Sequence, residues 1–288
     1  MINVDIYKRI LSDTETHDGL YLFLKNVFRL YPEDEFFALI KEQVAKNDEV
    51  IDIYNSIKDN LKNITPKLAD FKYALPSLKK QKQVIADQTK ELFETNKITD
   101  DLDGYLEIGT LGRHVKDNVK NLRISGPSYV VNESEPQNGL IDILERGSFR
   151  KRFDYIPLAD YTPIQQVPVG SLSLISCYIG LHHIVEDKLY QFIESIAKSL
   201  KVGGYFVLRD HDCITNKEVE FCNLIHSIFN LGTKEKWSVE EQEYRLFRSM
   251  QDWIDILSKY NLKIMDEGKL LQKGDPSKNM MVLFKKVK

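Results

Sequence analysis

From about residue 100 onward, short runs rich in β-branched and apolar residues alternate with stretches of helical periodicity. The apolar runs stand at 104–109, 129–133, 171–178 and 205–208, and the helical faces at 189–200 and from Trp253 onward. Strands that alternate with helices of about 10 to 15 residues are typical of βαβ units in a mostly parallel sheet. Two final runs, 262–265 and 280–284, predict a terminal hairpin. The pattern therefore predicts an α/β, Rossmann-like doubly wound fold.

The first hundred residues follow a different pattern and contain a single glycine, Gly19. Apolar residues recur at helical spacing in 36–44, 50–61 and 78–94, and the candidate N-caps of these helices are Asp34, Asn47 or Asp48, and Ser77. The basic run 79–82 is interpreted as a solvated face in preference to an anion-binding patch. We expect residues 1–99 to form a helical cap or substrate region, and residues 100–288 to form the Rossmann-like domain.

The overall charge does not favour binding of nucleic acid, because 40 basic and 43 acidic residues leave a net charge of −3. No stretch reaches the roughly 18 consecutive apolar residues of a membrane span, and no basic segment precedes an apolar core at the N-terminus. Three cysteines, Cys177, Cys213 and Cys222, cannot form a disulfide framework and match no zinc-ribbon spacing. We therefore expect reduced thiols, a cytoplasmic location and no membrane partner.

A glycine-containing turn follows the first predicted strand, in the pattern Glu107-x-Gly109-x-x-Gly112. Glycine permits a tight turn and a close approach of ligand to backbone, and the N-terminus of the next helix offers N–H groups. A dinucleotide site has a glycine where this chain has Glu107, and a carboxylate there would repel a pyrophosphate. The turn therefore disfavours NAD and favours a cationic cofactor that carries an amino acid.

These residues resemble the first motif of the class I S-adenosylmethionine-dependent methyltransferases, and further segments agree in order. The matching segments are 106–113, Glu133 (26 residues after Glu107), 159–161, 173–184 with its Leu-His-His ending, 196–208 with its Gly-Gly pair, and 248–253 with the final strands. The resemblance covers about residues 100–288 and rests on the order of the segments. It implies a seven-stranded sheet with a terminal antiparallel hairpin, and S-adenosylmethionine as cofactor with S-adenosylhomocysteine as product.

The resemblance also implies roles for individual residues. The cofactor would be bound by Glu107, Gly109, Thr110, Gly112, Arg113, Glu133, Asp160, Tyr161, Cys177 and Tyr178. Within that set, Glu133 would bind the ribose hydroxyls and Asp160 would face the adenine edge. The segment around Asp160 also has the composition of an ordinary turn, which is the alternative interpretation.

The chemistry is expected at the carboxyl ends of the strands, where open α/β sheets bind their ligands. His211 is the candidate general base, with Asp210 or Asp212 orienting it, and the alternative is that 209–212 only caps the strand with salt bridges. Candidate substrate contacts are His182, His183, Arg209, Asp212, Tyr244 and Arg245. The insert 213–249 is expected to be a helical lid or, alternatively, a packed cap without substrate contact. No metal is expected, because no histidine or cysteine spacing supports one.

Methyl transfer to an unidentified acceptor, a small molecule or a protein side chain, is the favoured function. A catalytically degenerate binding module is an alternative, because the first motif lacks the middle glycine of the family pattern. An RNA methyltransferase is a further alternative that the acidic balance disfavours, and an NAD-linked oxidoreductase is disfavoured by Glu107.

Overall fold

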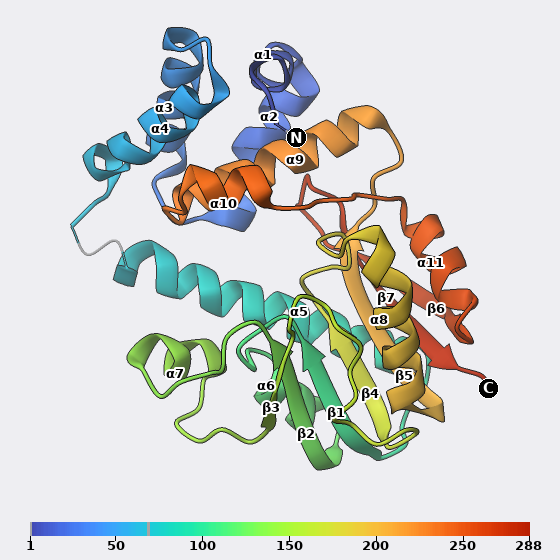
Figure 1. The fold of residues 1–288 in the computed structure, drawn as a ribbon. Coiled ribbons are helices and arrows are strands. Elements are labelled where there is room, and N and C mark those ends of the chain that lie inside the picture. Colours follow the sequence, from blue (N-terminus) through green and yellow to red (C-terminus); the bar gives the residue numbers. More distant parts are fainter. Residues whose placement is uncertain (1, 68–69) are drawn as a thin grey trace. The chain divides into compact units, whose positions relative to one another are not determined.

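The computed structural model describes residues 2–67 and 70–288, and the chain divides into two compact units (Figure 1). The helical unit comprises residues 1–81, 211–248 and 273–279, and the sheet unit comprises 82–210, 249–272 and 280–288. The division differs from the predicted boundary at 99/100. It falls inside the long helix α5 (Leu75–Thr95), and the insert after the fifth strand groups with the N-terminal helices.

The helical unit is built from short amphipathic helices and two π-helical turns. These are α1 (Val4–Ser12), α2 (Thr14–Phe23), η1 (Leu24–Phe28), α3 (Glu33–Lys46), α4 (Val50–Ile64), η2 (Asp70–Ala74), α9 (Asn216–Gly232) and α10 (Trp237–Gln242). Residues of α3 and α4, such as Ile40 and Ile57, share one hydrophobic core with Leu224 and Ile228 of α9. The insert predicted as a lid therefore contributes to the core of this unit.

The predicted N-caps differ from those observed. Helix α3 begins after Pro32, which places Asp34 in its first turn, and α4 begins after Glu49. Ser77 lies inside α5, where its hydroxyl donates to the carbonyl of Arg29 at 2.8 Å. The acidic first turn of α3 stabilises the helix through its dipole without a side-chain cap. The prediction took Asp34 as a capping residue and therefore placed the start of the helix too late.

The sheet unit confirms the predicted fold. Its strands are β1 (Leu102–Ile108), β2 (Ile124–Asn132), β3 (Asp154–Pro157), β4 (Leu172–Cys177), β5 (Leu200–His211), β6 (Leu262–Leu271) and β7 (Asn279–Lys286). They lie in the order β3-β2-β1-β4-β5-β7-β6. The pairs from β3 to β5 are parallel, and β6 pairs with β7 in antiparallel fashion, as the terminal hairpin predicted.

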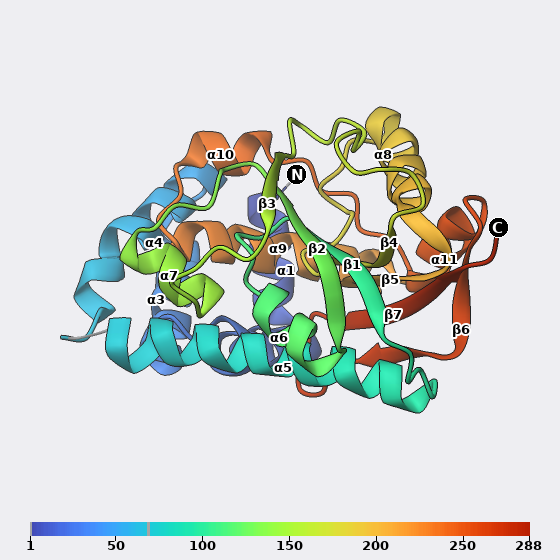
Figure 2. The same ribbon diagram turned by 90° about the horizontal axis from the view of Figure 1, so that it is seen from below.

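Helices cover both faces of the sheet (Figure 2). On one face, α8 (Glu186–Ser199) and α11 (Met250–Ser258) bury residues such as Phe192 and Trp253 against the strands. On the other face, α5 and α6 (Val115–Asn121) bury Phe93 and Val115. The remaining short helix of this unit is α7 (Leu140–Arg146). In the described residues, no helix is both long and apolar enough to traverse a lipid bilayer.

The strand order reverses between β1 and β4, which are neighbours in space although β2 and β3 lie between them in sequence. Ligands of open α/β sheets bind outside the carboxyl ends of the strands at such a switch point. The segments that follow β1 and β4 therefore mark the candidate site.

Candidate active site

The turn after β1 depends on glycine. Gly109 has φ of +81° and Gly112 has φ of +80°, a left-handed region that side chains with a Cβ rarely adopt. The N–H of Gly109 donates to the carbonyl of Val131 at the end of β2, at 2.7 Å. The turn is thus anchored between two parallel strands at the switch point.

Glu107 lies fully buried beneath this turn. Its carboxylate accepts hydrogen bonds from the Thr110 hydroxyl, from the backbone N–H of His114 at 3.2 Å, and from the Tyr105 hydroxyl at 3.1 Å. Burial raises the pKa of Glu107, and the hydrogen bonds from Thr110 and His114 oppose that rise. The carboxylate therefore organises the glycine turn from inside the protein.

Thr110 and Arg113 complete the turn. The Thr110 hydroxyl oxygen accepts from the backbone N–H groups of Gly112 and Arg113, each at 3.2 Å. The Arg113 guanidinium forms an ion pair with Glu145 of α7, at 2.6 Å. Thr110 thus shapes the loop, and Arg113 joins it to the neighbouring helix.

Two apolar side chains cover the glycines. A Cβ built on Gly109 would overlap the end of the Ile179 side chain, and one built on Gly112 would overlap the ring of Phe153. Ile179 itself is 36% exposed. Because the overlapping atoms are the ends of side chains, rotation of these side chains would open the backbone of the turn.

A buried polar network that sequence reasoning missed lies below the turn. Asn118 donates to the hydroxyl of Tyr105 at 2.8 Å and to that of Tyr178 at 2.9 Å. The Tyr105 hydroxyl also lies 2.7 Å from the Ser176 hydroxyl, and the Tyr178 hydroxyl lies 3.1 Å from that of Thr89. The alternation of Tyr105 and Glu107 along β1 was the available signal, since residues i and i+2 of a strand share one face.

Cys177 and Tyr178, both predicted to contact cofactor, are buried at the end of β4. Burial, together with the charge of Asp210, raises the pKa of the Cys177 thiol to about 12. Burial also raises the pKa of Tyr178 to about 12. The Tyr178 hydroxyl belongs to the network beneath the turn, so this side chain supports the site from below.

The ends of β2 and β3 present carboxylates to the outside. Glu133 directly follows β2 and is exposed. Asp160 forms an ion pair with Lys188 of α8, and the ring of Tyr161 packs edge-on against Phe192 at 5.7 Å. Residues 159–161 are all left-handed, with φ of 46°, 54° and 60°. Such strain persists only where the surroundings impose it, and it is common at ligand sites.

His182 and Asp210 form a buried pair at the ends of β4 and β5. The Nδ1 atom of His182 lies 2.6 Å from Oδ1 of Asp210, and Oδ2 of Asp210 accepts from the N–H of Leu181 at 2.8 Å. The ring of His183 lies against that of His182, with centroids 4.2 Å apart and an interplanar angle of 43°. The sequence analysis named Asp210 or Asp212 as the residue that orients His211, and in the structure both oxygens of Asp210 contact the Leu181–His182 turn.

Arg209, a predicted substrate contact, is turned into the protein. It is 9% exposed, donates to the carbonyl of Tyr178 at 3.2 Å and donates to the side-chain oxygen of Gln272 at 3.0 Å. These bonds join the end of β4 to the segment that follows β6. The guanidinium thus stabilises the floor of the site.

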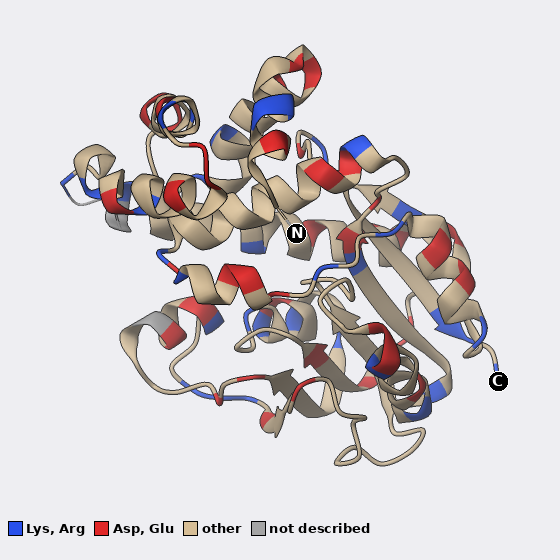
Figure 3. Cartoon of the chain, turned by 45° about the horizontal axis from the view of Figure 1, so that its top comes forward, with Lys and Arg blue, Asp and Glu red and all other residues tan. Residues whose placement is uncertain are grey.

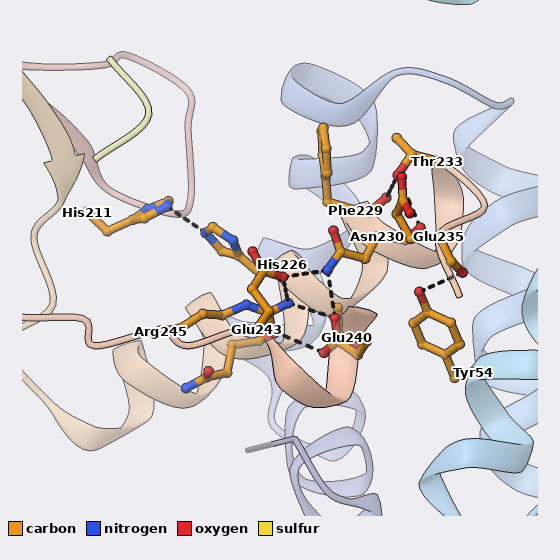
Figure 4. Close-up of polar contacts among 12 residues, drawn as sticks. Tyr54, His211, His226, Phe229, Asn230, Thr233, Glu235, Glu240, Glu243 and Arg245 are labelled. Carbon is orange, nitrogen blue, oxygen red and sulfur yellow. Dashed lines mark hydrogen bonds and ion pairs between the residues drawn. The ribbon is translucent and has the colours of Figure 1, made fainter. Parts of the chain in front are cut away.

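His211, the last residue of β5, groups with the helical unit, and its ring contacts that of His226 (Figure 4). Its Nδ1 lies 2.7 Å from the carbonyl of Ser277, and its Nε2 lies 3.1 Å from Nε2 of His226. Because a carbonyl only accepts, Nδ1 of His211 carries the proton and Nε2 accepts from His226. Both nitrogens of the candidate base are therefore engaged within the unit.

The predicted substrate contacts in and beside the insert 213–249 differ in burial and in their partners. Arg245 is buried and pairs with Glu240 at 2.6 Å and Glu243 at 2.5 Å, beside Asn230 of α9 (Figure 4). Tyr244 is 37% exposed. The N–H of Asp212 donates to the carbonyl of Lys278 at 3.1 Å. Arg245 thus forms part of a structural ion-pair cluster, while Tyr244 presents its ring to the surface.

Charged side chains of both signs are interspersed along the helices (Figure 3). This distribution agrees with the nearly balanced composition of the sequence. Such mixing of signs favours local fields over extended ones.

Comparison with known proteins gives no match to any family model and no significant match among curated proteins. Among solved structures, mitomycin 7-O-methyltransferase is 12% identical, with 98% of this chain and 71% of that chain covered and a TM-score of 0.49. An O-methyltransferase family 2 protein from Planctomyces limnophilus, in complex with apigenin, is 12% identical over 66% of this chain and 52% of that chain, with a TM-score of 0.46.

A further similar structure is the 1,6-didemethyltoxoflavin-N1-methyltransferase of Burkholderia thailandensis, with bound 1,6-didemethyltoxoflavin and S-adenosylhomocysteine. It is 11% identical over 70% of this chain and 79% of that chain, with a TM-score of 0.45.

Proposed function

We propose that the chain is an S-adenosylmethionine-dependent methyltransferase whose acceptor is a small molecule or a protein side chain. The observation that carries the proposal is the left-handed turn at Gly109, which stands at the switch point of a seven-stranded sheet with the order β3-β2-β1-β4-β5-β7-β6. The cytoplasmic location expected from the three thiols, all buried, is part of the proposal.

The residues at the strand ends fit a cationic cofactor that carries a nucleoside. Glu133 offers an exposed carboxylate to ribose hydroxyls, and the strained turn at Asp160 and Tyr161 offers an edge for the base. Glu107 holds the turn in shape from below, through hydrogen bonds from the Thr110 hydroxyl and the N–H of His114. When bound, the cofactor supplies an electrophilic methyl group on a sulfonium.

On the acceptor side, His182 is a stronger candidate for the base than His211. The proton on Nδ1 of His182 is held by Asp210, so the basic lone pair of the ring lies on Nε2. The negative charge of Asp210 also stabilises the imidazolium that forms when the ring accepts a proton. Asp210 is then a positioning residue for His182.

The degenerate binding module is the second candidate, and one observation favours it. Ile179 and Phe153 cover the glycines at which a cofactor would approach the backbone. If these side chains do not rotate away, the turn is a packed structural element without ligand.

Calorimetric titration of the whole chain with S-adenosylmethionine, S-adenosylhomocysteine and NAD distinguishes the candidates. We expect both sulfur compounds to bind and NAD to give no heat. Gly109→Val should abolish binding, because a branched Cβ meets Ile179 and strains a φ of +81°. Ile179→Ala should bind at least as tightly as the wild type, because it uncovers the turn.

A folded wild type that binds neither sulfur compound would leave the degenerate module as the better interpretation. If binding is observed, the acceptor is sought with radiolabelled methyl groups against fractionated metabolites, proteins and RNA. Labelling of RNA alone would replace the favoured acceptor classes.

A further inference from the structure

A cavity of about 280 Å³ lies within the helical unit, and none of its lining residues belongs to the sheet unit in the part of the chain that the structure describes. Its walls come from η1, the residues that follow η1, the turn η2 and the beginning of α5. Hydrogen bonds tie these walls together. The Ser77 hydroxyl of α5 donates to the carbonyl of Arg29, and the Tyr31 hydroxyl donates to the carbonyl of Gly232 on α9 at 2.8 Å.

Four cationic side chains line this cavity, and they come from separate segments. They are Lys25, Arg29, Lys72 and Lys80, and Glu33 is the one acidic side chain among the lining residues that the structure describes. The chain as a whole has more acidic than basic residues. The excess of positive charge is thus a local property of the cavity.

Among the side chains that the structure describes, which exclude those of residues 68–71, no ion pair joins these four cations to Asp or Glu. Other lysines of the same unit have acidic partners, for example Lys217 with Asp13 at 2.8 Å, and Lys278 with Glu218. Like charges that converge on one hollow repel each other, and an anionic ligand relieves this repulsion.

We propose that this cavity binds the phosphoryl group of a small phosphorylated molecule. A phosphoryl group carries up to two negative charges and several acceptor oxygens, which match converging lysine and arginine donors. The volume lies near the lower end for small-molecule pockets, about 300–1,000 Å³, so a small anion fits it better than a nucleic-acid backbone, which needs an extended basic surface.

The lysines of the basic run 79–82 have different surroundings in the structure. Lys79 and Lys80 are both exposed, but only Lys80 of the two lines the cavity. Lys82 belongs to the sheet unit, where its Nζ donates to the carbonyl of Glu145 at 2.5 Å. Lys79 therefore provides a matched control for Lys80, one position away on the same helix.

The test is a calorimetric titration of the full chain with inorganic pyrophosphate and, separately, with inorganic phosphate. Each titration is carried out at low and at moderate salt. Lys72→Gln and Lys80→Gln should each weaken pyrophosphate binding by on the order of tenfold, because each removes one charge-assisted contact. Lys79→Gln should bind as the wild type does. Circular dichroism of each variant confirms that the unit is folded.

Three outcomes would overturn the proposal. The wild type gives no saturable binding of either anion at millimolar concentration, or Lys79→Gln weakens binding as much as Lys80→Gln, which indicates diffuse attraction. In the third, a single-stranded RNA displaces pyrophosphate and loses affinity equally in all three variants, which indicates a nucleic-acid surface. None of these outcomes depends on methyl transfer, so the proposed function is tested separately.

Discussion

The imidazole of His182 and the carboxylate of Asp210 contact each other at 2.6 Å, with only 2% and 1% of their side chains exposed. They come from different strand ends, and Leu181 supplies a second hydrogen bond to the same carboxylate. A buried pair of this kind is destabilised strongly when one partner is removed, because the other is left without its counterpart. A substitution in this pair is therefore expected to affect both the packing around it and the proton transfer proposed for His182.

The first prediction concerns this pair. If His182 takes a proton from the acceptor, His182→Asn should lower the turnover rate by about 10²–10⁴-fold, the range typical of general-base catalysis. Cofactor affinity measured by calorimetry should change little. His211→Asn serves as the comparison, because both nitrogens of His211 are engaged by Ser277 and His226. A larger loss in His211→Asn than in His182→Asn would return the role of base to His211.

The second prediction concerns Gly180, which has φ of +87°. A Cβ there would lie 2.5 Å from Nδ1 of His182 and 2.9 Å from Cγ of Asp210. Gly180→Ala should therefore lower the free energy of unfolding by about 1–3 kcal/mol and impair turnover.

Gly139→Ala is its control, because a Cβ at Gly139 meets nothing within 4 Å and its φ is −65°. This variant should be neutral or slightly stabilised in chemical denaturation. Equal stabilities of the two variants would contradict the close packing around the His182–Asp210 pair.

The third prediction concerns removal of the N-terminal helices. If the N-terminal helices were only a cap over the site, deletion of residues 1–75 would affect turnover much more than melting temperature. The structure reverses this expectation, because α9 shares its hydrophobic core with α1 to α4. Deletion would expose Leu224 and Ile228, so the truncated chain should melt far earlier or aggregate in light scattering.

A second deletion separates the causes. When residues 213–248 are also replaced by a short flexible linker, the exposed apolar face of α9 disappears, and the product should be more soluble than the simple truncation. A simple truncation that keeps the melting temperature of the full chain would refute the shared core.

The fourth prediction is a pH dependence at the N-terminus of α9. The Glu218 carboxylate accepts from the N–H groups of Ile214 and Thr215, each at 2.8 Å, and pairs with Lys278. Burial opposes ionisation, but Lys278 and these N–H groups lower the pKa of Glu218 to about 2. A carboxyl with a lowered pKa stabilises the folded state above its unfolded pKa, and this contribution is lost as pH falls through the folded value.

Glu218→Gln should therefore reduce the free energy of unfolding at neutral pH by about 1–2 kcal/mol, the range of a helix cap. The difference from the wild type should shrink as pH falls from about 4.5 toward 2. Urea denaturation at several pH values measures it, with the exposed Glu241→Gln as control. A difference that does not change with pH would show that the ionised carboxylate is not the stabilising species.

The sheet and its turn were predictable because their signals are local. Short apolar runs, and helical runs between them, are decided by neighbours in sequence, so β1, β4 and β7 were located to within about two residues at each end. Strand β6 was predicted at 262–265 but extends to Leu271, because its second half is charged and contains Gly268. The start of β2 was placed five residues late, at 129 in place of Ile124, because Gly126 and Pro127 weaken the strand pattern.

Which groups the charged side chains contact could be determined only from the tertiary structure. The sequence by itself determined the doubly wound α/β fold, the glycine turn and the collection of polar residues at the strand ends. Only the folded chain decided that Glu107 points inward, that Asp210 holds His182, and that the insert builds one core with the N-terminal helices. The physical reason is range: backbone conformation follows from adjacent residues, whereas hydrogen-bond and packing partners are set by which distant segments meet in space.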